Sequence, residues 1–222
     1  MDDPQLEPQQ HLHALQGLAR INRWSRSARI VWEPIRALAR EHPGRPLRLL
    51  DLATGAGDLP LALWRLAGRH EVSLQIDGCD GSPYAVAYAR QRAAQAGASL
   101  GFFVFDVSAG PIPDGYDVVT ASLFLHHLDD APALALLARM ARAAGQLVVI
   151  NDLERSRRGW LLARAATRAL TRSRVVHADG PASVRSAYTM QELSRMAEQA
   201  GLHGARISRR WPCRMQLSWR KP

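Results

Sequence analysis

Two patterns of hydrophobic and polar residues alternate along this chain: short apolar runs and stretches with helical spacing. Short apolar runs predict buried strands at 47–52, 72–76, 100–105, 116–122 and 146–150. Apolar residues three and four positions apart predict helices at 59–67, 84–96, 132–144, 158–171 and 191–200. Strands that alternate with helices indicate an α/β fold with a doubly wound, mostly parallel sheet, whose ligands bind at the carboxyl ends of the strands.

The two ends of the chain depart from this alternation. Residues 11–40 have a helical pattern with a break or kink near Pro34. This pattern predicts an N-terminal helical cap over residues 1–45, with 1–10 disordered, or else a helix pair that simply packs on the sheet. At the other end, Ala205–Trp211 and Arg214–Trp219 predict a hairpin.

The stretch from Leu49 to Pro60 has the most specific pattern. A buried strand is followed by the turn Thr54-Gly55-Ala56-Gly57, and Asp58 is expected to cap a helix there. Glycine lets a ligand approach the backbone, so a strand, a glycine turn and a helix N-terminus predict a nucleotide cradle. Which nucleotide it holds is decided by the residues around the turn.

A dinucleotide is disfavoured at this turn. The fingerprint G-x-G-x-x-G/A fails at Pro60, where its third small residue would stand. The carboxylates of Asp51 and Asp58 would repel a pyrophosphate and attract an ammonium or sulfonium group. The only lysine is Lys221, which excludes a P-loop. S-adenosylmethionine, which has a sulfonium and an ammonium group and no phosphate, fits better.

The motif Asp51-x-Ala53-x-Gly55-x-Gly57 resembles the first motif of class I S-adenosylmethionine-dependent methyltransferases, which is usually (D/E)-x-G-x-G-x-G. Ala53 stands in place of the first glycine. The resemblance implies a Rossmann-like sheet with an antiparallel C-terminal strand and S-adenosylmethionine as cofactor. It also implies cofactor contacts from Asp51, Ala53, Thr54, Gly55 and Gly57.

Further cofactor residues are expected at the ends of the next strands. Asp80, next to Gly81, follows Gly57 at about the interval of a ribose-binding acid, and Ser82-Pro83 already supplies the alternative role of helix cap. In the resembling family an acid at Asp106 accepts the adenine amino group, with Val107 against the ring. Ser122 ends the fourth strand.

The segment Ser122–Leu128 resembles the segment after strand four in small-molecule methyltransferases related to the ubiquinone/menaquinone C-methyltransferases. It lacks the Asn/Asp-Pro-Pro-Tyr/Phe segment of enzymes that methylate nucleobases. The resemblance implies a small, fairly apolar hydroxylated acceptor (phenol, quinone or polyketide-like), methylated on oxygen or carbon. We expect His127 to act as general base, with His126 as the second candidate facing the other way. Alternatively, both histidines only shape the wall.

Residues 172–188 are polar and predict a long loop, part of a lid insertion over about 154–188. We hypothesise that Arg174, His177 and Arg185 face the acceptor, where arginine could grip a carboxylate or phosphate. Solvated arginines are the alternative.

Composition adds limits on partners and compartment. The chain of 222 residues is 47% hydrophobic and 22% charged, as in an ordinary globular protein. Its net charge of +9 comes from scattered arginines, which indicates a composition bias rather than nucleic-acid binding. Cys79 and Cys213 form neither a disulfide framework nor a metal site. A cytoplasmic protein with no metal, no membrane span and an open oligomeric state is expected.

Two other functions stay open at this stage. A module that binds S-adenosylmethionine without turnover would keep the cradle and fill the acceptor pocket with side chains. A nicotinamide-dependent oxidoreductase is disfavoured by Pro60 and by the carboxylates beside the turn.

Overall fold

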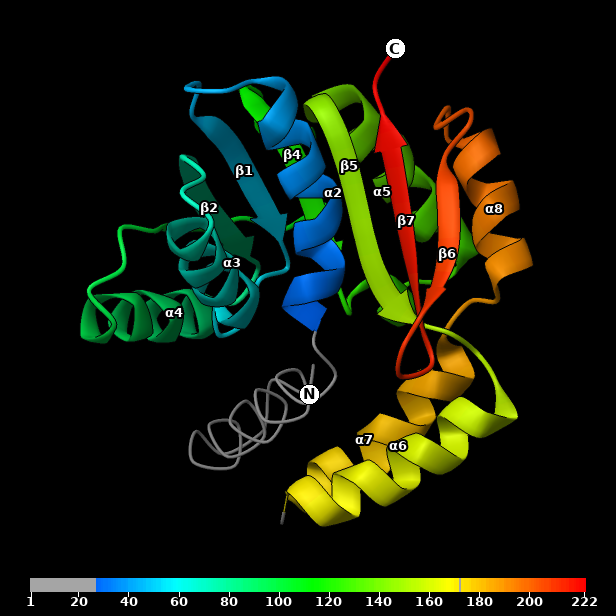
Figure 1. Cartoon of the computed structure of the whole chain (residues 1–222). Helices are drawn as coiled ribbons and strands as arrows, with labels where there is room; N and C mark the ends of the chain where they lie inside the picture. Colours follow the sequence, from blue (N-terminus) through cyan, green and yellow to red (C-terminus); the bar gives the residue numbers. More distant parts are fainter. Residues whose placement is uncertain (1–26, 172) are drawn as a thin grey trace.

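A seven-stranded sheet forms the centre of the computed structural model, which describes residues 27–171 and 173–222 (Figure 1). The strands are β1 Leu47–Leu52, β2 Leu74–Asp80, β3 Gly101–Val104, β4 Tyr116–Ser122, β5 Ala144–Leu153, β6 Arg206–Arg210 and β7 Arg214–Arg220. Their order is β3-β2-β1-β4-β5-β7-β6. Strands β1 to β5 pair in parallel, and β7 is antiparallel to both β5 and β6. The Rossmann-like fold and the terminal hairpin are confirmed.

Helices cover both faces of this sheet. They are α2 Ser27–Glu41, α3 Asp58–Arg69, α4 Pro83–Gln95, α5 Asp130–Ala143, α6 Arg157–Leu170, α7 Arg174–Ser186, α8 Met190–Gln199 and the short 3-10 helix η1 Leu125–His127. Alternate residues of a strand point to opposite faces. Leu47 and Leu49 of β1 therefore pack with α2 and α3, while Leu50 and Leu52 pack in the core that includes α5 and α8. Both faces of the central strands are thus buried.

Helix α2 packs on the sheet. Its buried side chains include Val31, Trp32, Ile35 and Leu38, which join the core formed with β1 and α3. Pro34 lies inside this one helix. The predicted cap covered residues 1–45; its residues 1–26, and with them the predicted disorder over 1–10, lie outside the described residues.

Three helix ends differ from the sequence prediction. Gly57, in a left-handed conformation, occupies the N-cap of α3, so Asp58 is the first helical residue and instead binds Arg92. Gly68 lies inside α3, which continues to Arg69. Gly145 lies inside β5, where a Cβ would be 3.1 Å from the Tyr116 carbonyl oxygen, so glycine favours the close pairing with β4. The prediction of Ser82 as the cap of α4 is confirmed.

The prediction of a loop at 172–188 was wrong, since residues 174–186 form helix α7. Ser173 caps the helix, and Val176 and Val184 are buried. Gly180 lies inside this helix, where a Cβ would lie 2.5 Å from Thr167 Cγ2 of α6. Glycine thus permits the close contact of α6 with α7. Figure 1 shows this helix pair beneath the carboxyl end of β5.

Candidate active site

The glycine turn after β1 brings two strand ends together. The Gly55 N–H donates to Asp80 Oδ2 at 2.8 Å, and the Ser82 N–H donates to Asp80 Oδ1 at 2.9 Å. The Asp80 carboxylate therefore bridges the turns that follow β1 and β2. Each of its oxygens keeps a lone pair for a ligand hydroxyl.

The glycines of this turn differ in what they permit. Gly55 has φ 54°, and a Cβ on it would meet nothing within 4 Å, so its backbone is open to a ligand. Gly57 has φ 71°, and a Cβ on it would lie 3.0 Å from the Phe102 ring. Gly57 thus serves the packing of the turn, whereas Gly55 leaves space beside it. A cradle with an open backbone and a carboxylate at its side fits a ribose.

Ala53, which stands where the family motif has its first glycine, adopts a backbone conformation that favours glycine. Its φ is 51°, in the left-handed region, which costs a residue with a Cβ about 1–2 kcal/mol. We expect Ala53→Gly to raise the free energy of unfolding by about 1 kcal/mol and the Tm by about 2–4 °C. Ala94→Gly, inside α4 and exposed, is the matched control and should lower stability by about 1 kcal/mol. Equal losses in both variants would contradict strain at Ala53.

Asp51 lies beneath the turn and is almost completely buried, with 2% of its surface exposed. The Thr54 hydroxyl donates to its Oδ2 at 2.7 Å, and the Thr120 hydroxyl of β4 donates to Oδ1 at 2.9 Å. Burial raises the pKa of this carboxyl to about 7 despite these two hydrogen bonds. At neutral pH, Asp51 is therefore poised between its protonated and ionised forms.

The remaining predicted cofactor residues lie at the ends of β2, β3 and β4. A Cβ on Gly81 would be 3.9 Å from Asp106 Cα, so these two strand ends are adjacent. The hydroxyl and N–H of Ser108 donate to Asp106 Oδ1 and hold the pKa of that carboxyl below its ordinary value. Val107 is buried, and Ser122 Oγ accepts a 2.8 Å hydrogen bond from Asn151 Nδ2.

Beyond β4, the short helix η1 carries both histidines. His126 is buried, and its Nδ1 lies 2.6 Å from Asp152 Oδ1 near the end of β5. Asp152 is 1% exposed and also accepts from the backbone N–H of Leu153 at 2.6 Å. Burial alone would raise the pKa of Asp152, but His126, the Leu153 N–H and the buried Arg214 together hold it below its ordinary value. An ionised Asp152 thus fixes the orientation and tautomer of His126.

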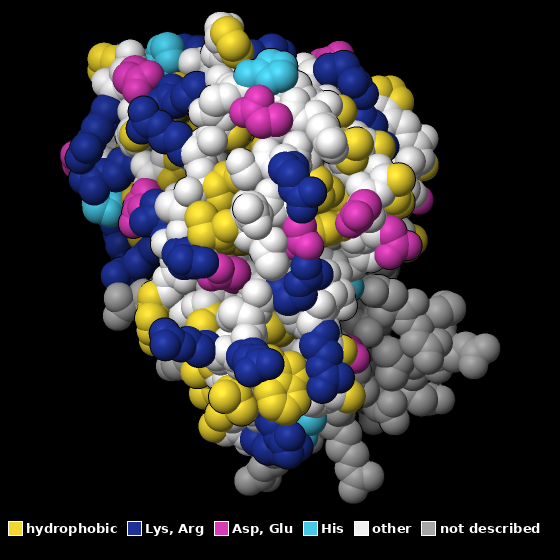
Figure 2. All heavy atoms as spheres, turned by 90° about the vertical axis from the view of Figure 1, so that its right-hand side faces the viewer, with side chains coloured by type: hydrophobic (Ala, Val, Ile, Leu, Met, Phe, Trp, Pro, Cys, Tyr) yellow, Lys and Arg dark blue, Asp and Glu magenta, His cyan; other side chains and the backbone are white. Residues whose placement is uncertain are grey.

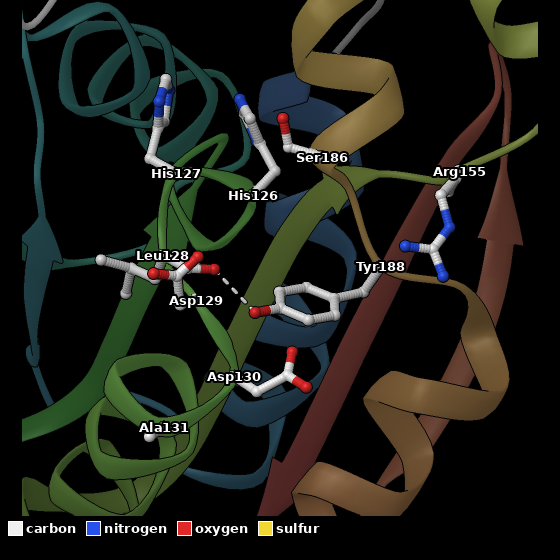
Figure 3. Close-up of a pocket in the computed structure, with 9 residues that line it drawn as sticks. All are labelled: His126, His127, Leu128, Asp129, Asp130, Ala131, Arg155, Ser186 and Tyr188. Carbon is white, nitrogen blue, oxygen red and sulfur yellow. Dashed lines mark hydrogen bonds between the residues drawn. The ribbon is translucent and has the colours of Figure 1, made fainter.

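His126 and His127 both line an open pocket of about 760 Å³ beside η1. Their ring centroids are 4.2 Å apart, and His127 is exposed while His126 is buried. Figure 3 shows His126 between His127 and Ser186 of α7, with Tyr188 below them. The Tyr188 hydroxyl donates to the Leu128 carbonyl at 2.7 Å. The other lining residues are Asp129, Asp130, Ala131 and Arg155.

The predicted acceptor residues of α7 have other contacts. His177 Nε2 lies 2.8 Å from the Thr171 carbonyl, and the Arg185 guanidinium stacks 5.3 Å from the Trp160 ring of α6. Neither is among the residues that line the pocket. The side chain of Arg174 lies outside the described atoms. Contact of these residues with an acceptor remains a prediction.

Several residues of the pocket and of the His126 pair were not predicted from the sequence, among them Asp152, Arg155 and Tyr188. Asp152 had a signal, since it follows an apolar strand as Asp80 and Asp106 do. Arg155 and Tyr188 had none, because they meet only through folding, when the Arg155 N–H donates to the Tyr188 carbonyl. The Arg155 side chain also pairs with Glu192 of α8.

Comparisons with known proteins agree with this arrangement. Residues 49–145 match a family described as a methyltransferase domain. The ubiquinone biosynthesis O-methyltransferase of Thiobacillus denitrificans is 30% identical over 203 residues, which cover 83% of this chain and 82% of that protein. The demethylmenaquinone methyltransferase of Thermus thermophilus is 41% identical over 108 residues, or 48% of this chain. The chain spans about half the length of that relative, with 47% covered.

Solved structures share the fold at low identity. The magnesium protoporphyrin IX methyltransferase of Synechocystis with bound S-adenosylhomocysteine has a TM-score of 0.61 at 16% identity, covering 99% of this chain and 90% of that one. A SAM-dependent methyltransferase of Aquifex aeolicus also scores 0.61, at 17% identity, with 98% of this chain and all of that chain covered (100%).

Proposed function

This chain belongs to the class I S-adenosylmethionine-dependent methyltransferases, and we propose that it methylates a small, fairly apolar hydroxylated acceptor such as a phenol or quinone. The observation that carries the proposal is the buried His126–Asp152 pair at a pocket that follows β4, the strand paired with β1. A pocket of this size leaves room for an acceptor, which argues against a module that only binds the cofactor. Relatives named for quinone biosynthesis support the acceptor class.

The residues at the strand ends fit S-adenosylmethionine. Gly55 leaves its backbone open, and Asp80 beside it offers two carboxylate oxygens to the ribose hydroxyls. Asp106 lies at the next strand end, where it would accept from the adenine amino group. Asp51 provides negative charge beneath the turn for the ammonium or sulfonium group. When bound, the cofactor supplies a methyl group on a positively charged sulfur.

His126 is the general base in this proposal. Its Nδ1–H donates to Asp152, which leaves the Nε2 lone pair to take the hydroxyl proton of an acceptor. With the cofactor bound, the deprotonated acceptor oxygen would take the methyl group; where the conjugated carbon takes it instead, that carbon would afterwards lose its own hydrogen as a proton to water. Asp152 stabilises the imidazolium that results, and the proton passes to water afterwards. His127, which we expected to be the base, is exposed and becomes the alternative.

The proposed activity is tested by incubating the protein with methyl-labelled S-adenosylmethionine and a panel of phenols and hydroquinones. We expect labelled product with at least one acceptor and S-adenosylhomocysteine in equal amount. Calorimetry with S-adenosylmethionine and with NADH separates the competing functions. Cofactor binding without turnover on any acceptor would favour a binding module, and NADH binding would favour an oxidoreductase.

The role of Asp80 gives a separate prediction. Asp80→Ala removes charge-assisted hydrogen bonds to the ribose, worth roughly 1.5–3 kcal/mol, so affinity for S-adenosylmethionine should fall about 10- to 150-fold. Asp114→Ala, an exposed acid in the loop before β4, is the matched control and should bind normally. Circular dichroism checks folding, because Asp80 also holds the turns after β1 and β2. A folded Asp80→Ala protein with unaltered affinity would refute the ribose contact.

A further inference from the structure

Helix α6 has a surface that the proposed chemistry does not use. Its sequence RRGWLLARAATRAL contains no acid, and its arginines Arg157, Arg158, Arg164 and Arg168 are all exposed. Leu161 lies among them and is 61% exposed, although leucine is usually buried. Residues 157, 161, 164 and 168 follow helical spacing, so they share one side of α6. This side of α6 therefore presents one exposed leucine among positively charged side chains only.

A second large hydrophobic residue lies on the turn that contacts α6. Trp211, in the turn between β6 and β7, is 63% exposed. The turn and the start of α6 approach closely, since a Cβ on Gly159 would be 3.3 Å from the Cys213 Cβ. Arg209 of the same hairpin is exposed. Figure 2 shows hydrophobic side chains bordered by arginines on the lower part of this side of the molecule.

The arginines of this surface are partly ordered by an aromatic ring. The guanidinium groups of Arg164 and Arg185 stack on Trp160 at 5.6 and 5.3 Å from its centroid. Stacking holds both guanidinium groups along the helix pair. The sequence from 155 to 188 opposes its many arginines with a single acid, Asp179.

We propose that Leu161 and Trp211, with the arginines of α6, form a docking surface for an anionic lipid bilayer. A basic helix with exposed leucine and a nearby tryptophan has the features of helices that lie in the membrane interface. The arginines attract anionic headgroups, and the two apolar side chains enter the headgroup region. Docking here is peripheral, because no helix in the described part of the chain is long and apolar enough to cross a membrane.

Nucleic acid is the other polyanion that could meet this surface. Phosphate contacts would use the arginines in the same way, but they would leave Leu161 and Trp211 exposed to water. A bilayer accounts for both the charge and the exposed apolar side chains, so it is the partner that the surface favours. The two partners differ in their dependence on Leu161.

The surface also lies close to the acceptor pocket. Helix α7 packs on α6, and Ser186 at the end of α7 lines the pocket with His126. Docking would therefore hold the pocket near the bilayer, where an acceptor with a lipid tail could enter. This last consequence rests on the proposed function, whereas docking itself does not.

Sedimentation with vesicles tests the docking. The whole chain is mixed with vesicles of phosphatidylcholine alone or with phosphatidylglycerol, at several salt concentrations. We expect binding only to the anionic vesicles, weaker at high salt. Arg158→Glu should lower the partition coefficient about 10-fold. Its matched control, Arg69→Glu at the end of α3, makes the same charge change on another surface and should lower it about twofold or less.

The apolar part is tested in the same assay. Leu161→Glu should lower the partition coefficient at least 10-fold, whereas Val104→Glu, on an exposed strand residue at the other edge of the sheet, should have a clearly smaller effect. Calorimetry with S-adenosylmethionine, without lipid, checks that each variant keeps the proposed cofactor site, so the two proposals can fail separately.

Three results would overturn the proposal. The first is no binding of the parent protein to phosphatidylglycerol vesicles. The second is an equal loss for the α6 variants and their controls, which would indicate that only net charge matters. The third is displacement from vesicles by a random DNA duplex that binds the parent and Leu161→Glu equally well, which would favour nucleic acid.

Discussion

Replacing His126 with glutamine is expected to lower the rate of methyl transfer about 10²- to 10⁴-fold, the usual contribution of a general base. Glutamine keeps a polar side chain of similar length but cannot take up a proton at neutral pH. Affinity for S-adenosylmethionine should change little, because His126 is not among the residues expected to hold the cofactor, which lie at the ends of β1 to β4. Single-turnover kinetics with labelled cofactor, together with calorimetry, measure both quantities.

The neighbouring histidine supplies the matched control. His127→Gln changes the same side chain in the same pocket but does not remove the contact with Asp152. We expect a much smaller loss of rate for this variant. The reverse result, with His127→Gln the more damaging, would return the base to His127.

The acidity of the acceptor distinguishes a base from a wall residue. A phenol that is already ionised at the assay pH needs no base, so the deficit of His126→Gln should shrink as phenols become more acidic. A deficit that is constant across all phenols would mean that His126 only positions the acceptor.

The glycine turn could be predicted because its signals are local. An apolar run, the spacing of Gly55 and Gly57 and the acid at Asp80 all lie within one strand–helix–strand unit. The alternation of apolar runs with helical patterns likewise predicted the doubly wound, mostly parallel sheet. The family resemblance then supplied the cofactor.

The acceptor pocket could not be predicted in the same way. The His126–Asp152 contact joins residues 26 positions apart, because η1 follows β4 and Asp152 lies near the end of the neighbouring β5. Helix α7 was predicted to be a loop because its segment is polar, and it contains Gly180 and Pro181. Only the contact with Thr167 of α6 shows why glycine stands there. Such information lies in tertiary packing, which a local pattern does not contain.

Replacing Asp51 with asparagine is expected to stabilise the fold at alkaline pH while it weakens cofactor binding. Burial raises the pKa of Asp51 to about 7, above its ordinary value of 3.8. Between these two values the folded protein holds a proton that the unfolded chain has released, so stability falls as pH rises through this window. Above pH 7 the ionised carboxylate costs the folded state up to about 4 kcal/mol.

Asp51→Asn removes this cost. We expect its free energy of unfolding to exceed that of the parent by about 2–4 kcal/mol at pH 8, and to equal it near pH 4, as measured by urea denaturation. Asp117→Asn is the control, for which we expect a change in the free energy of unfolding of the opposite sign. Burial would raise the pKa of Asp117, but the Arg48 N–H, Gln146 and Arg45 hold it below its ordinary value. Its ionised form therefore stabilises the fold, and Asp117→Asn should lower stability at pH 8.

The buried carboxylate of Asp51 lowers the stability of the folded protein, and we expect it to be present because its negative charge helps to bind the cofactor. The ionised Asp51 attracts the ammonium and sulfonium groups of S-adenosylmethionine, so Asp51→Asn should lose about 10-fold or more in affinity at pH 8. In the parent, binding should strengthen from pH 6 to pH 8 and release a proton, which calorimetry in buffers of different ionisation enthalpy detects. Asp51→Asn should show neither effect. If the variant is stabilised at pH 8 and yet binds S-adenosylmethionine as tightly as the parent, Asp51 has no electrostatic role in binding the cofactor.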